Sequence, residues 1–173
     1  MLFKFHNDEC FLYFYPMKMQ FWSVGKAHEV YAKAGIEEFS KRLNNYFPAD
    51  WLIIAPPKNA GTLSEAELKK AEAALILAQL QKDDHLILLD ERGKNLSSPE
   101  LAQWIQQRAN SSTKRIVFLI GGAFGVDETV TKRADLVWSL SRLVFPHMLV
   151  RLILAEQVYR ACTILRNEKY HHS

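Results

Sequence analysis

The sequence has 173 residues and a mass of 20.0 kDa, which is the size of one ordinary domain. Hydrophobic residues make up 49% of the chain and charged residues 24%, with only 7 Gly and 6 Pro, so the composition excludes a disordered or collagen-like chain. No run of about 18 apolar residues is present, so we expect no segment that spans a membrane.

The net charge is +3, too mild by itself to indicate a nucleic-acid-binding protein. Residues 1–138 hold 17 basic and 17 acidic side chains, so the whole excess lies in residues 139–173. That segment carries two acidic residues, Glu156 and Glu168, and five basic ones, Arg142, Arg151, Arg160, Arg166 and Lys169. A local excess of three also arises by chance, so the position of the charge assigns no partner alone.

The two cysteines, Cys10 and Cys162, have neither a disulfide framework nor metal-ligand spacing, and we expect no metal. Cys162 falls in an apolar helical stretch, where we expect a buried, inert thiol. This usage suits a reducing cytoplasm.

The first sixteen residues differ from the rest of the chain. His6 to Glu9 interrupt their apolar character, so we do not expect this segment to act as a signal peptide. We expect residues 1–16 to be an extension upstream of the domain formed by residues 17–173, with Met17 or Met19 as the functional start. The alternative is an accessory strand or partner-binding arm.

Taken in chain order, short apolar runs alternate with stretches of helical spacing. Up to residue 80 the pattern predicts a strand at Met19–Val24, a helix at His28–Phe47, a strand at Trp51–Ala55, a Gly-containing loop at Lys58–Thr62 and a helix from Ser64 to Leu80. Ser64 and Glu67 form the capping-box pattern that starts a helix.

The second half continues the alternation. It predicts a strand at His85–Leu89, a helix from the N-cap Ser98 to Asn110, a strand at Arg115–Ile120, a short helix from the cap Asp127 to Ala134, a strand at Leu136–Leu140 and a long helix from Pro146 to Arg166. Strands with continuous apolar character, each separated by a helix, are typical of a parallel sheet covered on both faces. We therefore predict a single α/β domain with a mainly parallel sheet and helices on both faces.

Ligands of such sheets bind beyond the carboxyl ends of the strands, which directs attention to three loops. Gly121–Gly125 offers close backbone approach and positive φ, although a tight turn explains it equally. Asp90–Lys94 is charged and is also typical of a solvated turn. Ser139–Pro146 stays apolar through a loop, so it must pack against a ligand, another loop or a partner chain.

The last helix is apolar on nearly every side, as expected if it is buried in its own core and in a partner. A homodimer is the economical explanation. At about 100° per residue, His147 and Arg151 share one side, while Glu156 and Arg160 lie roughly opposite as a possible i, i+4 pair. His147 is equally consistent with a structural histidine.

Four segments together resemble one family: LLDERGKNLSSPELA, FLIGGAFG, SLSRLVFPHMLVRLILAEQVYRA and the terminal YHH. They are similar to the ribosomal large subunit methyltransferase H family, which belongs to the SPOUT class of RNA methyltransferases. The resemblance runs from about Met17 to the C-terminus. It implies a C-terminal trefoil knot, which general folding rules would not propose.

The resemblance also implies a reaction: methylation of N3 of a pseudouridine in helix 69 of 23S rRNA on the assembled ribosome, by a cytoplasmic homodimer. The methyl donor S-adenosyl-L-methionine would lie in the knot. The residues implied to hold it are Leu89, Gly121, Gly122, Ser141, Arg142, Leu143, Val144, Phe145 and Pro146.

The implied catalytic residues are His147, Arg151, Tyr170 and His171, and the implied RNA-binding residues are Arg151, Arg160, Tyr170, His171 and His172. His147 or a tail residue would take the N3 proton or orient the base, and Tyr170 would stack on a base. Two positions depart from the family pattern. Val144 replaces a usual Thr, which removes a hydroxyl from the donor loop, and His172 replaces a usual Arg or Lys, which makes phosphate binding more dependent on pH.

Two other functions fit parts of the pattern. A non-catalytic ribosome-binding or assembly factor would keep the fold, but the intact Gly121-Gly122 pair and FPH-x-x-x-R motif speak against it. A nucleotide-dependent oxidoreductase would use the Gly-rich turn, but no acidic residue ends the strand that follows a first Gly-rich turn.

Overall fold

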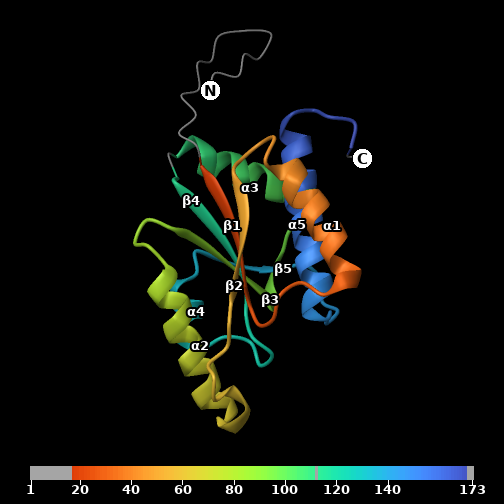
Figure 1. The fold of residues 1–173 in the computed structure, drawn as a ribbon. Coiled ribbons are helices and arrows are strands. Elements are labelled where there is room, and N and C mark those ends of the chain that lie inside the picture. The colour runs from red at the N-terminus through yellow and green to blue at the C-terminus, as the bar shows by residue number, and fades with distance from the viewer. Residues whose placement is uncertain (1–16, 112, 171–173) are drawn as a thin grey trace.

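The computed structural model describes residues 17–111 and 113–170 (Figure 1). The proposed extension 1–16 and the tail residues His171 and His172 lie outside the described residues. The strands are β1 (Lys18–Val24), β2 (Ala49–Ile54), β3 (His85–Asn95), β4 (Arg115–Ile120) and β5 (Leu136–Ser139). The helices are α1 (Val30–Leu43), the 3-10 turn η1 (Ala60–Thr62), α2 (Glu65–Gln79), α3 (Ser98–Asn110), α4 (Glu128–Arg133) and α5 (His147–Leu165).

The five strands form one sheet in the order β2-β1-β4-β3-β5, and every neighbouring pair is parallel. The register brings Phe21 of β1, Phe118 of β4 and Ile87 of β3 into one row across the centre. The predicted single α/β domain with a parallel sheet is therefore confirmed.

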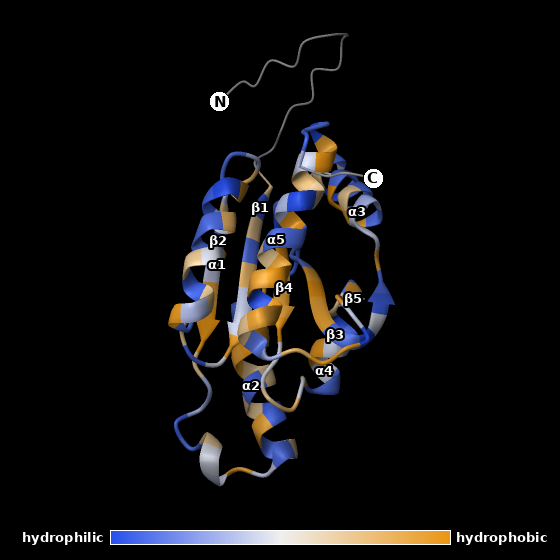
Figure 2. Ribbon diagram, turned by 90° about the vertical axis from the view of Figure 1, so that its right-hand side faces the viewer, coloured by the Kyte–Doolittle hydropathy of each residue, from blue (hydrophilic) through white to orange (hydrophobic). Residues whose placement is uncertain are grey.

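Successive residues of the central strands enter two different cores, as the pleat of a strand requires. Phe21, Ile87 and Phe118 pack with side chains of α1, α3 and α5, while their neighbours in sequence pack with side chains of α2 and α4. Figure 1 shows the two helix layers on opposite sides of the sheet, and in Figure 2 strand β4 is coloured hydrophobic while the end of β3 is hydrophilic. Burial on both faces explains the continuous apolar runs of these strands.

Local side-chain hydrogen bonds set the helix starts. The capping box of Ser64 and Glu67 is present as predicted, and Asp127 caps α4 by accepting from the backbone N–H of Thr129. For α3 the predicted cap was one residue late. Ser97 is the N-cap, because its side chain and that of Glu100 form the reciprocal pair.

The third strand is longer than predicted. Instead of ending at Leu89, β3 runs to Asn95, and both Leu89 and Lys94 pair with Trp138 of β5. Residues 90–93 therefore form a bulge within the strand pairing. Gly93 is required there, because a Cβ at this position would lie 2.6 Å from the carbonyl oxygen of Val137.

The last helix α5 packs between α1 and α3 and begins at the carboxyl end of the sheet, near the bottom of Figure 1. Gly35 of α1 allows close approach, because a Cβ there would lie 2.7 Å from the side chain of Leu152. Cys162 is buried, as predicted, and burial raises the pKa of its thiol to about 12. Its inertness stays a prediction. Among the described residues, no helix combines the length and apolar character needed to cross a bilayer.

Candidate functional site

The three segments predicted to carry chemistry meet around one cavity of about 990 Å³, at the bulge of β3 and the carboxyl ends of β4 and β5. A volume near this size is typical of a small-molecule site. The predicted ligand-binding residues that line it are Leu89, Gly121, Gly122, Ser141, Leu143, Val144 and Phe145, together with His147. The other two, Arg142 and Pro146, are exposed and do not line it.

The Gly-rich loop, residues 121–125, closes on itself through a hydrogen bond from the Gly125 N–H to the Gly122 carbonyl (3.0 Å). The predicted positive φ occurs at Gly125, at 82°, while Gly121 and Gly122 have ordinary φ values. The predicted close approach occurs at both of these, although the chain itself supplies the neighbour. A Cβ would lie 2.7 Å from Val126 at Gly121 and 2.3 Å from the Glu72 carboxylate at Gly122.

The charged segment 90–92 forms one wall of the cavity. Arg92 binds Asp90 through two side-chain hydrogen bonds, of 2.9 Å from Nε and 2.7 Å from Nη2. This pairing lowers the pKa of the Asp90 carboxyl. The segment belongs to a strand that pairs on both sides of the bulge, so the turn interpretation is wrong, while Glu91, Arg92 and Lys94 are exposed to solvent as that interpretation expects.

The apolar loop, residues 140–146, is held by hydrogen bonds of two serines. The Ser139 hydroxyl donates to the Ser141 carbonyl (2.8 Å), and the Leu143 N–H donates to the Ser141 hydroxyl (2.9 Å). These bonds hold the turn but leave its apolar side chains outward, with Leu143 69% and Val144 79% exposed. Across the cavity, Phe124 of the Gly-rich loop is 54% exposed. The rim is therefore apolar on both sides.

His147 is the first residue of α5 and lines the cavity. Burial, and secondarily the nearby guanidinium of Arg151, lower the pKa of its imidazole. The neutral form therefore predominates at pH 7, and a neutral imidazole is able to accept a proton.

Arg151, one turn further along α5, lies inside the protein and is 1% exposed. Its Nε donates to the Ser23 hydroxyl (2.9 Å), and its Nη1 donates to the Lys26 carbonyl (2.9 Å) and lies 3.2 Å from His28 Nδ1. Burial lowers the pKa of the guanidinium. These contacts hold the segment after β1 against α5, so Arg151 shares a side with His147 without lining the cavity. Its roles toward RNA and in catalysis stay predictions.

The predicted pair of Glu156 and Arg160 is confirmed, with Arg160 Nη2 2.6 Å from Glu156 Oε1. Tyr170 joins it, because its hydroxyl donates to the same Oε1 (3.1 Å) and its ring lies 4.7 Å from the Arg160 guanidinium carbon. At about 1.5 Å rise per residue, these partners lie ~14 to ~20 Å along α5 from His147. The structure therefore does not bring Tyr170 and Arg160 together with His147 in one chain.

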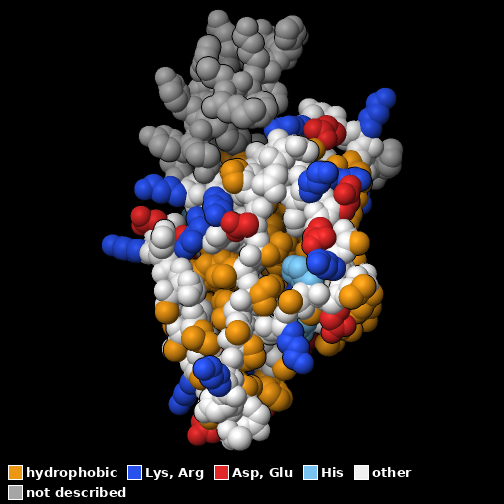
Figure 3. Space-filling view, viewed as in Figure 1, with side chains coloured by type: hydrophobic (Ala, Val, Ile, Leu, Met, Phe, Trp, Pro, Cys, Tyr) orange, Lys and Arg blue, Asp and Glu red, His pale blue; other side chains and the backbone are white. Residues whose placement is uncertain are grey.

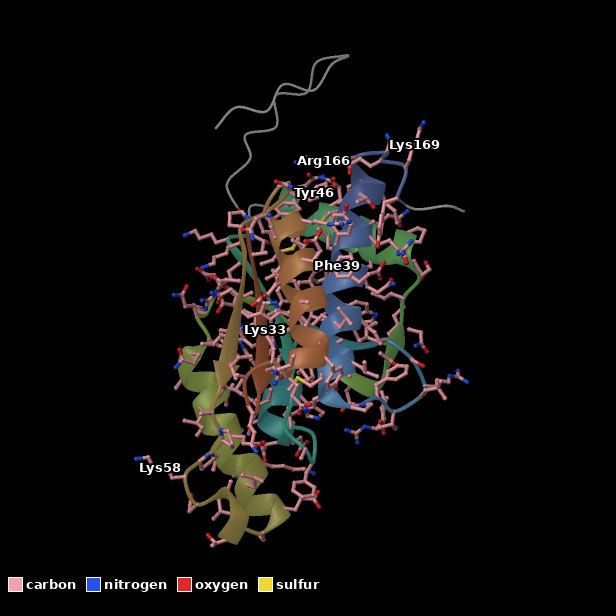
Figure 4. The ribbon with its side chains drawn as sticks, turned by 45° about the vertical axis from the view of Figure 1, so that its right-hand side comes forward. Lys33, Phe39, Tyr46, Lys58, Arg166 and Lys169 are labelled. Carbon is pink, nitrogen blue, oxygen red and sulfur yellow. The ribbon has the colours of Figure 1, made fainter. Side chains whose placement is uncertain are left out.

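The same end of α5 carries further aromatic and cationic contacts. The Arg166 guanidinium carbon lies 4.3 Å from the Tyr46 ring, and Figure 4 shows these two side chains close together where α1 and α5 end. Tyr170 packs edge-on against Tyr159 at 4.8 Å. The C-terminal basic segment is thus interleaved with aromatic rings.

Several cavity residues were missed from the sequence. Lys69, one turn before Glu72 on α2, and Trp138 of β5 both line the cavity. The Trp138 indole N–H is buried without a hydrogen-bond partner among the described residues. Nothing in the spacing of Lys69 marks it, because α2 lies far from the three loops in sequence. The pattern around Trp138 indicates only a buried residue of a strand.

An all-parallel α/β sheet whose loops form a cavity beyond the strands is typical of enzymes that bind a small ligand at that edge. The comparison with known families identifies the class of enzyme. A family model described as a predicted SPOUT methyltransferase matches residues 17–171.

Curated relatives agree along nearly their whole length. The proteins named ribosomal RNA large subunit methyltransferase H from Cytophaga hutchinsonii and Parabacteroides distasonis are 47% and 42% identical over 156 residues. These alignments cover 90% of this chain and 100% and 99% of the relatives. The protein of that name from Geobacter metallireducens is 42% identical over 157 residues. The chain belongs to this family of SPOUT methyltransferases.

Proposed function

We propose that this protein transfers a methyl group from S-adenosyl-L-methionine to N3 of a pseudouridine in helix 69 of 23S ribosomal RNA on the assembled ribosome. The proposal rests on two observations that agree, the family match of the sequence and the position of the three loops in the structure. The match extends from residue 17 to residue 171, and the three loops implied by the resemblance line a single cavity. Its place of action is the cytoplasm, where ribosomes are assembled.

The cavity suits the methyl donor in size and chemistry. Its lining combines apolar side chains such as Leu89 and Phe145 with the backbone of the buried Gly121 and Gly122. These groups fit a ligand with an apolar ring and several hydrogen-bonding edges. S-adenosyl-L-methionine supplies an activated methyl group, and the protein has to position it against the base.

The chain's own chemical task is to remove the N3 proton as the methyl group arrives. His147 is the candidate for this step, because it lines the cavity and its lowered pKa keeps the imidazole neutral. The buried Arg151 supports His147 from one turn away. Its positive charge disfavours protonation of the resting imidazole.

We also propose that the working unit is a homodimer with its site near the interface. Tyr170 is bound ~14 to ~20 Å along α5 from His147, so a catalytic tail reaches a cavity most directly from a second subunit. Apolar surface is available for such an interface. Val30 is 90% and Tyr31 62% exposed, and hydrophobic side chains gather over the start of α1 at the right-hand edge of Figure 3.

Arg160, Tyr170, His171 and His172 are the proposed contacts to the RNA, through phosphates and by stacking on a base. Tyr170 supports this role, because its ring is already stacked on the Arg160 guanidinium. The trefoil knot implied by the resemblance is likewise proposed for the segment from β5 through α5. Pulling single molecules by both termini tests it, because a knotted chain stops short of its full contour length.

The decisive experiment has two arms. Nucleoside mass spectrometry of ribosomal RNA from a strain lacking the protein should show loss of one N3-methylated pseudouridine. Purified protein with S-adenosyl-L-methionine should restore it on ribosomes from that strain. Unchanged modification in the deletion strain would refute the proposed reaction.

A further inference from the structure

A buried carboxyl group lies directly behind the Gly-rich loop. Glu72, on the inward side of α2, is 6% exposed and follows Leu68 by one turn. Among the described residues, no hydrogen bond or ion pair reaches its carboxylate. Burial without a compensating cation raises the pKa of this group. The side chain is therefore shielded from most solvent, although its carboxyl oxygens are not among the fully buried unpaired atoms of the described residues.

The carboxyl of Glu72 lies against Gly122. A Cβ on Gly122 would lie 2.3 Å from Glu72 Oε2 and 2.8 Å from both Oε1 and Cδ. An alanine at position 122 therefore requires the end of the Glu72 side chain to leave its present position. Gly122 lines the cavity, whereas Glu72 does not. Glu72 therefore acts on a bound ligand only through the loop.

We propose that Glu72 is a positioning residue for methyl-donor binding, whose carboxyl rests against Gly122 and fixes the Gly-rich loop at the cavity wall. The inference rests on the proposed function, since it takes the cavity to be the donor site. It differs from the usual explanation of a glycine in a ligand loop, in which the ligand needs the space. Here the side chain of Glu72 on α2 occupies the space beside Gly122.

This difference makes a double-variant test possible. Binding of S-adenosyl-L-methionine is measured by calorimetry for Gly122→Ala, Glu72→Ala and the double variant, with thermal melting of each. We expect Gly122→Ala alone to weaken binding about tenfold or more, as forced overpacking does. The double variant should bind at least about fivefold more tightly than Gly122→Ala, because the collision has been removed. Gly61→Ala is the matched control, since nothing lies within 4 Å of a Cβ there.

Two variants of Glu72 separate shape from charge and do not depend on a folded Gly122→Ala. Glu72→Gln keeps the shape, so we expect donor affinity within about twofold of wild type and no rescue of Gly122→Ala. Glu72→Asp withdraws the carboxyl by one methylene and should weaken donor binding while the melting temperature stays close to wild type.

The outcomes are distinct. A double variant no tighter than Gly122→Ala would mean that the ligand itself needs the space, and would overturn the role of Glu72. Wild-type affinity in Glu72→Asp would overturn it as well. If the wild-type protein bound no S-adenosyl-L-methionine, the proposed function would fail first.

Discussion

Replacing Arg151 with alanine should destabilise the protein as well as reduce methylation. The side chain is 1% exposed, and its hydrogen bonds join α5 to Ser23 at the end of β1 and to the Lys26 carbonyl beyond it. Sequence alone suggested an RNA contact whose loss would spare stability. The burial of the guanidinium changes that expectation.

The magnitude follows from what the alanine leaves behind. Unpairing the buried Ser23 hydroxyl costs about 1 to 3 kcal/mol, and losing the partly buried hydrogen bond to the Lys26 carbonyl costs about 1 kcal/mol. Deleting the two methylenes Cγ and Cδ of the stem removes ~0.8 kcal/mol of burial for each. Releasing a buried, unpaired guanidinium offsets part of this loss. We expect a net loss near 3 kcal/mol, which lowers the melting temperature by roughly 6 to 12 °C in a domain of this size.

The assay combines calorimetric melting with methylation of ribosomes at a temperature where the variant is folded. Lys132→Ala is the control, because Lys132 forms an exposed pair with Glu128 on α4 and should change stability by less than about 0.5 kcal/mol. A variant of Arg151 that melts like wild type while methylation collapses would refute the reasoning. It would show that the guanidinium leaves its buried position to act on the substrate.

Three further predictions concern the tail, the thiol and the histidine at the cavity. Removing residues 170–173 should abolish RNA methylation but leave S-adenosyl-L-methionine affinity within about twofold, and equal loss of both would contradict the tail assignment. Cys162 should resist thiol reagents in the native protein at about pH 8 and react only on unfolding, since its pKa is raised to about 12; rapid native labelling would show that the site opens. Because the pKa of His147 is lower in the folded protein, the unfolded chain binds a proton at this residue more readily. The free energy of unfolding is therefore unaffected by His147 above about pH 6.5 and decreases as the pH falls below that value. Melting from about pH 8 to about pH 5 should therefore fall more steeply for wild type than for His147→Gln, and parallel curves would count against a buried neutral imidazole.

The sequence was sufficient for the layers of this fold because each central strand is apolar on both faces. Runs such as Arg115–Ile120 have no polar alternation, and only a sheet covered twice buries them fully. The helix starts at Ser64 and Asp127 were predictable because the hydrogen bonds that cap a helix join residues two or three positions apart in the sequence. The charged residues after Leu89 favoured a turn, but the structure places them in a bulged strand whose Arg92 side chain is exposed to solvent.

The site was predictable where it depends on strand ends and not where it depends on helix packing. The three loops had to meet, because parallel strands bring their carboxyl ends to one edge. The inward direction of Arg151 and the approach of Glu72 to Gly122 arise from helices packed across the sheet, and periodicity places a residue on a face without naming its neighbour. The family resemblance predicted which residues belong to the site but not which of them are buried.

The bulge in β3 has a consequence for how such cavities diversify. Leu89 and Lys94 both pair with Trp138, so the register shifts across the bulge and the four residues between them enter the wall without a partner on β5. Gly93 is fixed by its close approach to Val137, which leaves residues 90–92 as the part of the segment that can vary in charge. The ion pair of Asp90 and Arg92 is therefore the simplest place for evolution, or an engineer, to alter the charge of the cavity wall.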